Sequence, residues 1–140
     1  EKDRVFIEIP QGYQRIKGRA FEEWTLLERI WMPDSVKEIG ANAFYGCSHL
    51  TQIRWSQNLE KIETGAFCGC SSLKRICLPE GVTEIGNAAF LKCTHLESIK
   101  LPSSLKKIGT NVFQGCCNLN KIEMERGISP QIRKALEEII

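Results

Sequence analysis

The sequence predicts an α/β repeat solenoid, because apolar residues recur along the 140-residue chain with a period of 23 residues. The phenylalanines that share this period are Phe21, Phe44, Phe67, Phe90 and Phe113. Isoleucines keep the same step in columns that begin at Ile7 and Ile16, and leucines keep it in a column that begins at Leu27. A unit this short cannot bury its own apolar face, so stacked units must share one continuous core.

Prolines and cysteines follow the same period and fix the limits of the repeats. The prolines in one phase are Pro10, Pro33, Pro79 and Pro102, with Ser56 in the remaining place. The cysteines in another phase are Cys47, Cys70, Cys93 and Cys116, with Trp24 in the earliest copy. We therefore divide a single domain, residues 1–140, into a first strand over 1–9, repeats over 10–32, 33–55, 56–78, 79–101 and 102–124, and a C-terminal cap over 125–140.

Each repeat is predicted to contain a strand, a short extended segment and one helical turn. Stretches such as Leu50–Trp55 end in the alternation typical of a strand with one buried face. Segments such as Val82–Gly86 are short extended pieces ended by glycine, and segments such as Asn87–Cys93 are too short to form a stable helix alone. We expect one parallel sheet, with its strands in sequence order near Phe6–Ile9, Ile30–Met32, Ile53–Trp55, Ile76–Leu78, Ile99–Leu101 and Ile122–Met124.

The two ends of the predicted solenoid differ. Ser129 is a favourable helix N-cap and Pro130 suits the first helical position. Apolar residues then follow at helical spacing, at Ile132, Ala135, Leu136, Ile139 and Ile140. We expect residues 130–140 to form a helix that covers the open end of the core, although a free helix that docks on a partner has the same pattern. At the other end, Val5–Ile9 is predicted to be an edge strand that frays or pairs with another chain.

The stretch from Leu73 to Cys93 follows the pattern L-x-x-I-x-L-P-x-x-V-x-x-I-G-x-x-A-F-x-G-C, with Lys92 in place of the second of its glycines. This pattern resembles that of the BspA-type leucine-rich repeats, and the resemblance covers about residues 5–124. It implies a right-handed arc with a parallel sheet on the concave side and short helical turns on the outer side. It also implies a surface or secreted protein, several relatives being linked with adhesion. The departures are local: Trp24 replaces Cys, Trp55-Ser56 replaces Leu-Pro, Glu63 and Lys92 replace Gly, and Lys17-Gly18 shifts the glycine by one.

Composition and charge exclude several classes of protein. The net charge of +2 is too small to require nucleic acid or an anionic membrane as the partner. No apolar run approaches the roughly 18 residues of a membrane-spanning helix. The start of the chain, Glu1–Ile9, is charged and alternating, so it is not expected to be a signal peptide, and a leader or further repeats could precede it.

The seven cysteines are expected to be structural. Cys68-x-Cys70 and Cys116-Cys117 lack the C-x₂-C spacing that is typical of zinc sites. Four of the seven occupy one repeat position, where free cysteine packs as a small hydrophobe. Cysteines on in-register neighbours would lie roughly 5 Å apart, but their Cβ atoms would run side by side, which disfavours disulfide bonds. We therefore expect no metal and no cofactor.

Catalysis by the two histidines is disfavoured by their place in the repeat. His49 and His95 share one position with Ser72 and Asn118, and they lie two repeats apart, roughly 10 Å. A catalytic pair of Cys47 and His49 is the alternative, but the repeat assigns that cysteine column to the core. No phosphate-binding loop, nucleophile elbow or acid pair stands apart from the repeat register. We expect no enzyme activity and no small-molecule substrate.

Function is sought where the copies differ on an exposed face. Strand positions that alternate with the buried isoleucines form one row of Phe6, Arg29, Gln52, Arg75, Ser98 and Lys121. A second row consists of Glu8, Trp31, Arg54, Cys77, Lys100 and Glu123. The rows are rich in basic residues, and tryptophan is typical of binding hot spots. The predicted partner-binding residues are Arg29, Trp31, Arg54, Arg75, Cys77, Lys100 and Lys121.

These features favour a non-enzymatic protein- or matrix-binding module, with an acidic partner among the candidates. Exposed faces of solenoids commonly bind partners. The same charges could instead only keep the sheet soluble, and the chain would then be a structural spacer that displays another domain. Nucleic-acid binding through the basic rows is a remoter alternative, which a steep salt dependence would favour. Self-association through the strand at Val5–Ile9 is a further expectation.

Overall fold

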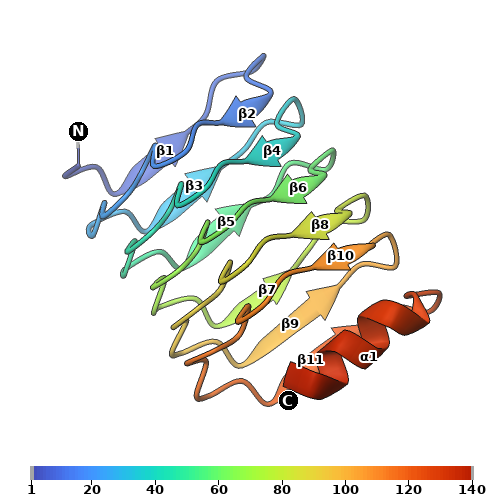
Figure 1. Cartoon of the computed structure of the whole chain (residues 1–140). Coiled ribbons are helices and arrows are strands. Elements are labelled where there is room, and N and C mark those ends of the chain that lie inside the picture. Colours follow the sequence, from blue (N-terminus) through green and yellow to red (C-terminus); the bar gives the residue numbers. More distant parts are fainter. Residues whose placement is uncertain (1, 140) are drawn as a thin grey trace.

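The chain winds into a β-solenoid with one turn per repeat (Figure 1). The computed structural model describes residues 2–139. Each turn contributes a front strand of three or four residues, and these are β1 (Phe6–Glu8), β3 (Arg29–Trp31), β5 (Gln52–Arg54), β7 (Arg75–Cys77), β9 (Ser98–Leu101) and β11 (Lys121–Met124). Side strands of two residues follow them, and these are β2 (Arg15–Ile16), β4 (Glu38–Ile39), β6 (Lys61–Ile62), β8 (Glu84–Ile85) and β10 (Lys107–Ile108).

Paired front strands are parallel and keep the 23-residue register. Ile30 pairs with Ile53, and Ile76 pairs with Ile99. The isoleucine column points into the core, since Ile30 is fully buried, whereas its neighbour Arg29 is exposed. This confirms the predicted stacking of repeats in one register.

The front strands do not form the single sheet that the sequence predicts. They form two sheets, β1-β3-β5 and β7-β9-β11, and no Cα atom of β5 lies within 8 Å of a Cα atom of β7 (Figure 1). We call the boundary between two neighbouring turns a joint. The joint between β5 and β7 coincides with Trp55-Ser56, which replaces the Leu-Pro pair seen at Leu78-Pro79. The indole ring of Trp55 packs against the core ring of Phe67, with centroids 5.5 Å apart. A large ring in the inward column thus lies at the place where the front strands separate.

The side strands stay continuous across the same joint. They form one parallel sheet in the order β2-β4-β6-β8-β10, which confirms the predicted short extended segments. Neighbouring turns approach closely here, and a Cβ atom on Gly40 would lie 2.5 Å from the backbone nitrogen of Gly18. Glycine is required at this position because a side chain would collide with the preceding turn.

The outer segment of each repeat is a pair of tight turns and not a full helical turn. Within the segment, the N–H of Cys47 donates to the carbonyl of Phe44 at 3.1 Å. The N–H of Phe44 instead donates to Ala66 of the next repeat at 2.8 Å. Left-handed backbone at Asn42 (φ 56°) and Gly46 (φ 74°) interrupts any helix. The predicted helical turn is therefore present only in part: alternate N–H groups form local turn hydrogen bonds within the segment, and the others bond to the next turn.

Phenylalanine rings form the centre of the core. They stack with neighbouring centroids 5.1–6.2 Å apart in the order Phe21, Phe44, Phe67, Phe90 and Phe113. The central three rings have no exposed surface. The stack runs through every joint, including the one at which the front sheet is divided.

Helix α1 (Pro130–Ile139) lies across the C-terminal end of the solenoid, beside β10 and β11 (Figure 1). The Ser129 hydroxyl accepts a hydrogen bond from the N–H of Ile132 at 3.2 Å, which confirms the predicted N-cap. Ile132 and Leu136 are buried, so the apolar stripe packs on the chain itself. The side chain of Ile139 and all of Glu1 and Ile140 lie outside the described residues. In the described part of the chain, no helix has the length and apolar character needed to cross a membrane.

The cysteine column is buried as predicted, and each of its thiols is also hydrogen-bonded. The Sγ atoms lie 3.1–3.2 Å from phenylalanine carbonyl oxygens of the preceding repeat, and the four thiols are those of Cys47, Cys70, Cys93 and Cys116. Burial raises the pKa of Cys47 to about 12 and also raises the pKa of Cys70. All four thiols tie their turn to the one before it, and burial keeps those of Cys47 and Cys70 neutral, whereas a hydrogen bond with Cys93 lowers the pKa of Cys116.

We expect Phe67→Ala to lower the free energy of unfolding by about 3–5 kcal/mol, because it opens a cavity inside a fully buried stack. Denaturant titration followed by circular dichroism measures the loss. Tyr45→Ala is the control, since the Tyr45 side chain lies on the outer surface and is 40% exposed. A loss below about 1 kcal/mol for Phe67→Ala would show that this stack is not the core.

Thiol labelling tests the cysteine column. In the native protein at neutral pH, the exposed Cys77 and Cys117 should react with iodoacetamide. The four column cysteines should react only after unfolding, because they are buried and the thiolate is the reactive form. Mass spectrometry of digested samples assigns each site, and rapid native labelling of Cys70 or Cys93 would contradict the buried column.

Candidate partner-binding face

The front strands present all the predicted binding residues on one face, but the joint between β5 and β7 divides them. Arg29, Trp31 and Arg54 lie on the first sheet. The second sheet carries Arg75, Cys77, Lys100 and Lys121. All seven are exposed or half-buried. The two groups differ in what surrounds their charges.

On the first sheet, cations lie over aromatic rings. The Arg54 guanidinium carbon is 4.4 Å from the centroid of the Trp31 ring, and that of Arg29 is 5.0 Å from the centroid of Phe6. The Phe6 and Trp31 rings meet edge to face, with centroids 4.8 Å apart. We call these four residues the aromatic–arginine cluster. The parallel register produces it, because Phe6 lies opposite Arg29 and Trp31 lies opposite Arg54.

Phe6 belongs to this cluster, although it was not among the predicted binding residues. The 23-residue repeat could have identified Phe6, because in-register pairing of the first two front strands places it directly opposite Arg29. An aromatic residue beside an arginine on an exposed row favours a cation–π contact.

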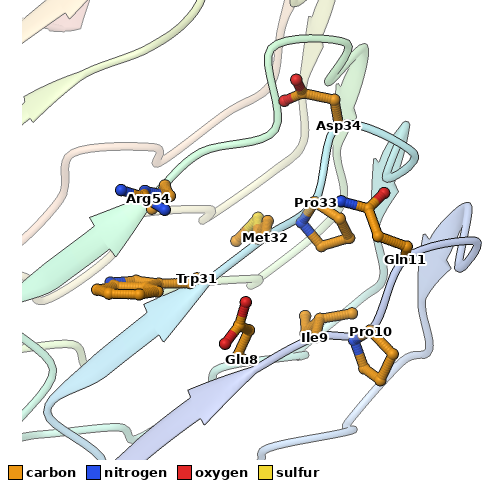
Figure 2. Close-up of a pocket in the computed structure, with 9 residues that line it drawn as sticks. All are labelled: Glu8, Ile9, Pro10, Gln11, Trp31, Met32, Pro33, Asp34 and Arg54. Carbon is orange, nitrogen blue, oxygen red and sulfur yellow. The ribbon is translucent and has the colours of Figure 1, made fainter.

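A hollow of about 450 Å³ opens beside the cluster (Figure 2). Three successive turns line it, with Trp31 and Arg54 on one side and Pro10 and Pro33 on the other. The remaining lining residues are Glu8, Ile9, Gln11, Met32 and Asp34. The hollow therefore combines an aromatic wall, a guanidinium group and two carboxylates.

On the second sheet, basic residues are paired with carboxylates. Lys100 lies 2.7 Å from Glu125, and its hydrogen bond to that carboxylate raises the pKa of Lys100. Lys121 lies 2.8 Å from Glu123, and its hydrogen bond lowers the pKa of the Glu123 carboxyl. Arg75 has a longer contact, 3.8 Å, with Glu97. The positive charge available to a partner is therefore smaller than the sequence suggests.

Arg29 and Arg54 differ from these three residues, because neither forms an ion pair within the described part of the chain. Their guanidinium groups keep free donors for an incoming carboxylate. Cys77 is an exposed thiol that lies opposite Lys100 across the β7–β9 pair. The structure gives it no contact with the aromatic–arginine cluster, which lies on the other sheet.

The histidine position is a structural one. The Nδ1 atom of His49 lies 2.7 Å from the carbonyl oxygen of Thr25, and that of His95 lies 2.8 Å from Ser71. Asn118 donates in the same way to Thr94 at 3.0 Å. The position thus carries a side chain that bonds the preceding turn. Across residues 2–139 no group of three or more side chains suited to hold a metal ion is found.

Comparison with known proteins supports the fold. A family profile for the BspA type leucine-rich repeat region matches residues 5–120 in six copies. No curated protein gives a significant sequence match. A solved structure of a leucine-rich cell surface protein from Faecalibacterium prausnitzii is 39% identical, with a TM-score of 0.87 over 95% of this chain and 35% of that one. A leucine-rich repeat protein from Bacteroides ovatus is 35% identical, with a TM-score of 0.69 over 88% of this chain and 38% of that one.

The pneumococcal vaccine antigen PcpA shares the fold at 19% identity, with a TM-score of 0.79 over 98% of this chain and 39% of that one. The chain thus spans little more than a third of the length of these three proteins. The matched region begins just before β1 and ends just before β11. The 23-residue period, the parallel solenoid and the profile match all agree. The chain therefore belongs to the BspA-type leucine-rich repeat family.

Proposed function

We propose that this chain is a protein- or matrix-binding module of a surface or secreted protein, and that its partner docks on the aromatic–arginine cluster. The observation that carries the proposal is the unbroken series of contacts from Arg29 to Phe6, from Phe6 to Trp31 and from Trp31 to Arg54 on an exposed face. Stacking of the repeats does not require these side chains, because other copies have different polar residues in the same columns.

The cluster has the composition and order of a binding hot spot. Tryptophan and arginine are enriched at such spots, where they fill or line desolvated pockets. The contacts between rings and guanidinium groups hold the side chains in place, so less freedom is lost when a partner binds. A partner that covers the Trp31 ring and enters the neighbouring hollow would bury apolar surface next to Ile9 and Met32.

The charges of the face favour a partner with a few carboxylates over a strongly acidic one. Arg29 and Arg54 can each donate two parallel hydrogen bonds to a carboxylate. Lys100 and Lys121 already have carboxylate partners within the chain. Glu8 and Asp34 line the hollow, so a partner amine or guanidinium group would fit there.

A location at the cell surface or outside the cell is supported by the similar structures. One of them is a cell surface protein, and another is a vaccine antigen. A role in adhesion belongs to the same proposal, because an adhesive module requires an exposed face that can bind protein or matrix. A pure spacer would need no ordered cluster on its face.

Trp31→Ala should raise the dissociation rate of the partner and weaken binding by about 2 kcal/mol or more, because it removes the apolar centre of the cluster. The partner is first captured from the native environment on immobilised wild-type chain, and the kinetics are then measured by surface plasmon resonance. Circular dichroism establishes that the variant is folded.

The control is Lys37→Glu combined with Lys107→Glu, two exposed positions outside the front strands. This double variant should bind like the wild type. If it weakens binding while Trp31→Ala does not, the partner docks elsewhere on the solenoid. A captured nucleic acid with a steep salt dependence would support the nucleic-acid alternative instead.

Self-association through β1 stays a prediction and is part of the same proposal. β1 has β3 as its one neighbour in its sheet, so its outer edge carries unpaired backbone groups. In dilute monomer, N–H groups of β1 should exchange with deuterium faster than those of β9, which is paired on both sides. At high concentration the β1 groups should gain protection if chains pair there, and equal protection of β1 and β9 in the monomer would contradict an open edge.

A further inference from the structure

We propose that the opening between β5 and β7 is a second binding site, which takes an extended segment of a partner polypeptide as an additional parallel strand. The inference deepens the proposed function, and it rests on that function in taking the partner to be a polypeptide. The site adjoins the aromatic–arginine cluster at Arg54, which belongs to both, so the test that separates them uses Phe6, which contacts Trp31 and Arg29 and does not border the opening.

The opening between β5 and β7 is wider than the spacing of two paired strands. Neighbouring strands lie about 4.8 Å apart, so an inserted strand would separate its two neighbours by roughly 9.6 Å. No Cα atom of β5 lies within 8 Å of a Cα atom of β7. The same turns remain joined at both ends of these strands, where Ser72 donates to Ser48 at 2.6 Å and Thr83 donates to Glu60 at 2.8 Å. The opening is therefore limited to the front strands, because the two turns are hydrogen-bonded on either side of it. We call this opening between β5 and β7 the slot.

The edges of β5 and β7 that face the slot carry backbone N–H groups whose equivalents are hydrogen-bonded between the other neighbouring front strands. In the first sheet, the N–H of Met32 donates to the carbonyl of Arg54 at 2.9 Å. The equivalent N–H of Trp55 makes no backbone hydrogen bond to any described residue. The N–H of Arg75 likewise lacks the bond to Thr51 that the repeat register provides elsewhere. A strand added between these two unpaired edges would form backbone hydrogen bonds with both of them.

Side chains around the slot favour a segment that alternates acidic and apolar residues. The exposed rim consists of Gln52, Arg54, Lys74 and Arg75. At one end the rim widens into a hollow of about 330 Å³, lined by Thr51, Ser72, Lys74 and Arg75. None of these residues is acidic. Inward-facing residues of the segment would meet Ile53, which is more exposed than the buried Ile30 and Ile76 of its column.

The probe is a blocked heptapeptide of alternating glutamate and valine, with calorimetry to measure binding and hydrogen exchange to locate it. We expect it to bind the wild-type chain and to protect the N–H groups of Trp55, Arg75 and Cys77. The control peptide has the same sequence with N-methylated valines, which keeps the charge and side chains but removes backbone donors along one edge. It should bind roughly tenfold more weakly or worse, a loss of about 1.4 kcal/mol.

Trp55→Leu restores the residue that other repeats carry and should let β5 pair with β7. We expect the N–H of Arg75 to become protected without peptide, and peptide affinity to fall roughly tenfold or more. Met32→Leu is the matched control, because it makes the corresponding change at a joint that is already closed. Phe6→Ala should also leave peptide binding unchanged, since Phe6 contacts Trp31 and Arg29 and does not border the slot.

Several outcomes would overturn the slot while the proposed function stands. Equal binding of the N-methylated peptide by the wild type would show attraction by charge alone, and this arm needs no variant to fold. Undiminished binding by folded Trp55→Leu, or a loss with Phe6→Ala instead, would place the peptide elsewhere. Protection of Arg75 and Cys77 in the free wild-type protein equal to that of β9 would show that the slot is closed in solution.

Discussion

The whole structure depends on one constraint, that each turn of the solenoid contains 23 residues and therefore meets the next turn in register. Because of it, backbone groups bond between turns in the front sheets, in the side sheet and in the outer turns. The same register stacks the phenylalanine rings and places each column thiol on a phenylalanine carbonyl of the preceding turn. No turn could be stable alone, since its donors, its acceptors and its apolar face are all completed by its neighbours.

The proposed function rests on side chains that the register does not fix. The aromatic–arginine cluster arises where two exposed columns place aromatic residues against arginines, at Phe6–Arg29 and Trp31–Arg54. The front sheet is divided at Trp55, where the inward column holds an indole ring, and the proposed slot lies there. In both places the repeat supplies a rigid frame, and one or two departures from it create a surface that other copies lack. A module of this kind can change its partner without changing its fold.

The sequence predicts the repeat length, the strands, the buried cysteines and the C-terminal helix, because each appears as a column or a capping pattern. It does not predict the conformation of the outer turns, since a segment such as Asn87–Cys93 gives no sign that its alternate N–H groups bond to the next turn. Nor does a column show that its thiols donate hydrogen bonds. Trp55-Ser56 was visible as a departure, but its effect on the sheet depends on how an indole packs against Phe67. On the candidate face, the columns predicted which side chains are accessible, but not the ion pairs that they form within the chain, such as that of Lys100 with Glu125.

The central claim is that the 23-residue register is the default at every joint, and that a single departure, Trp55, opens the front sheet. A crystal structure of the Trp55→Leu variant tests this most directly. The account predicts that β5 and β7 pair in parallel with Ile53 opposite Ile76, so that the front strands become one sheet. A variant structure in which leucine is accommodated and β5 and β7 still lie apart would contradict it.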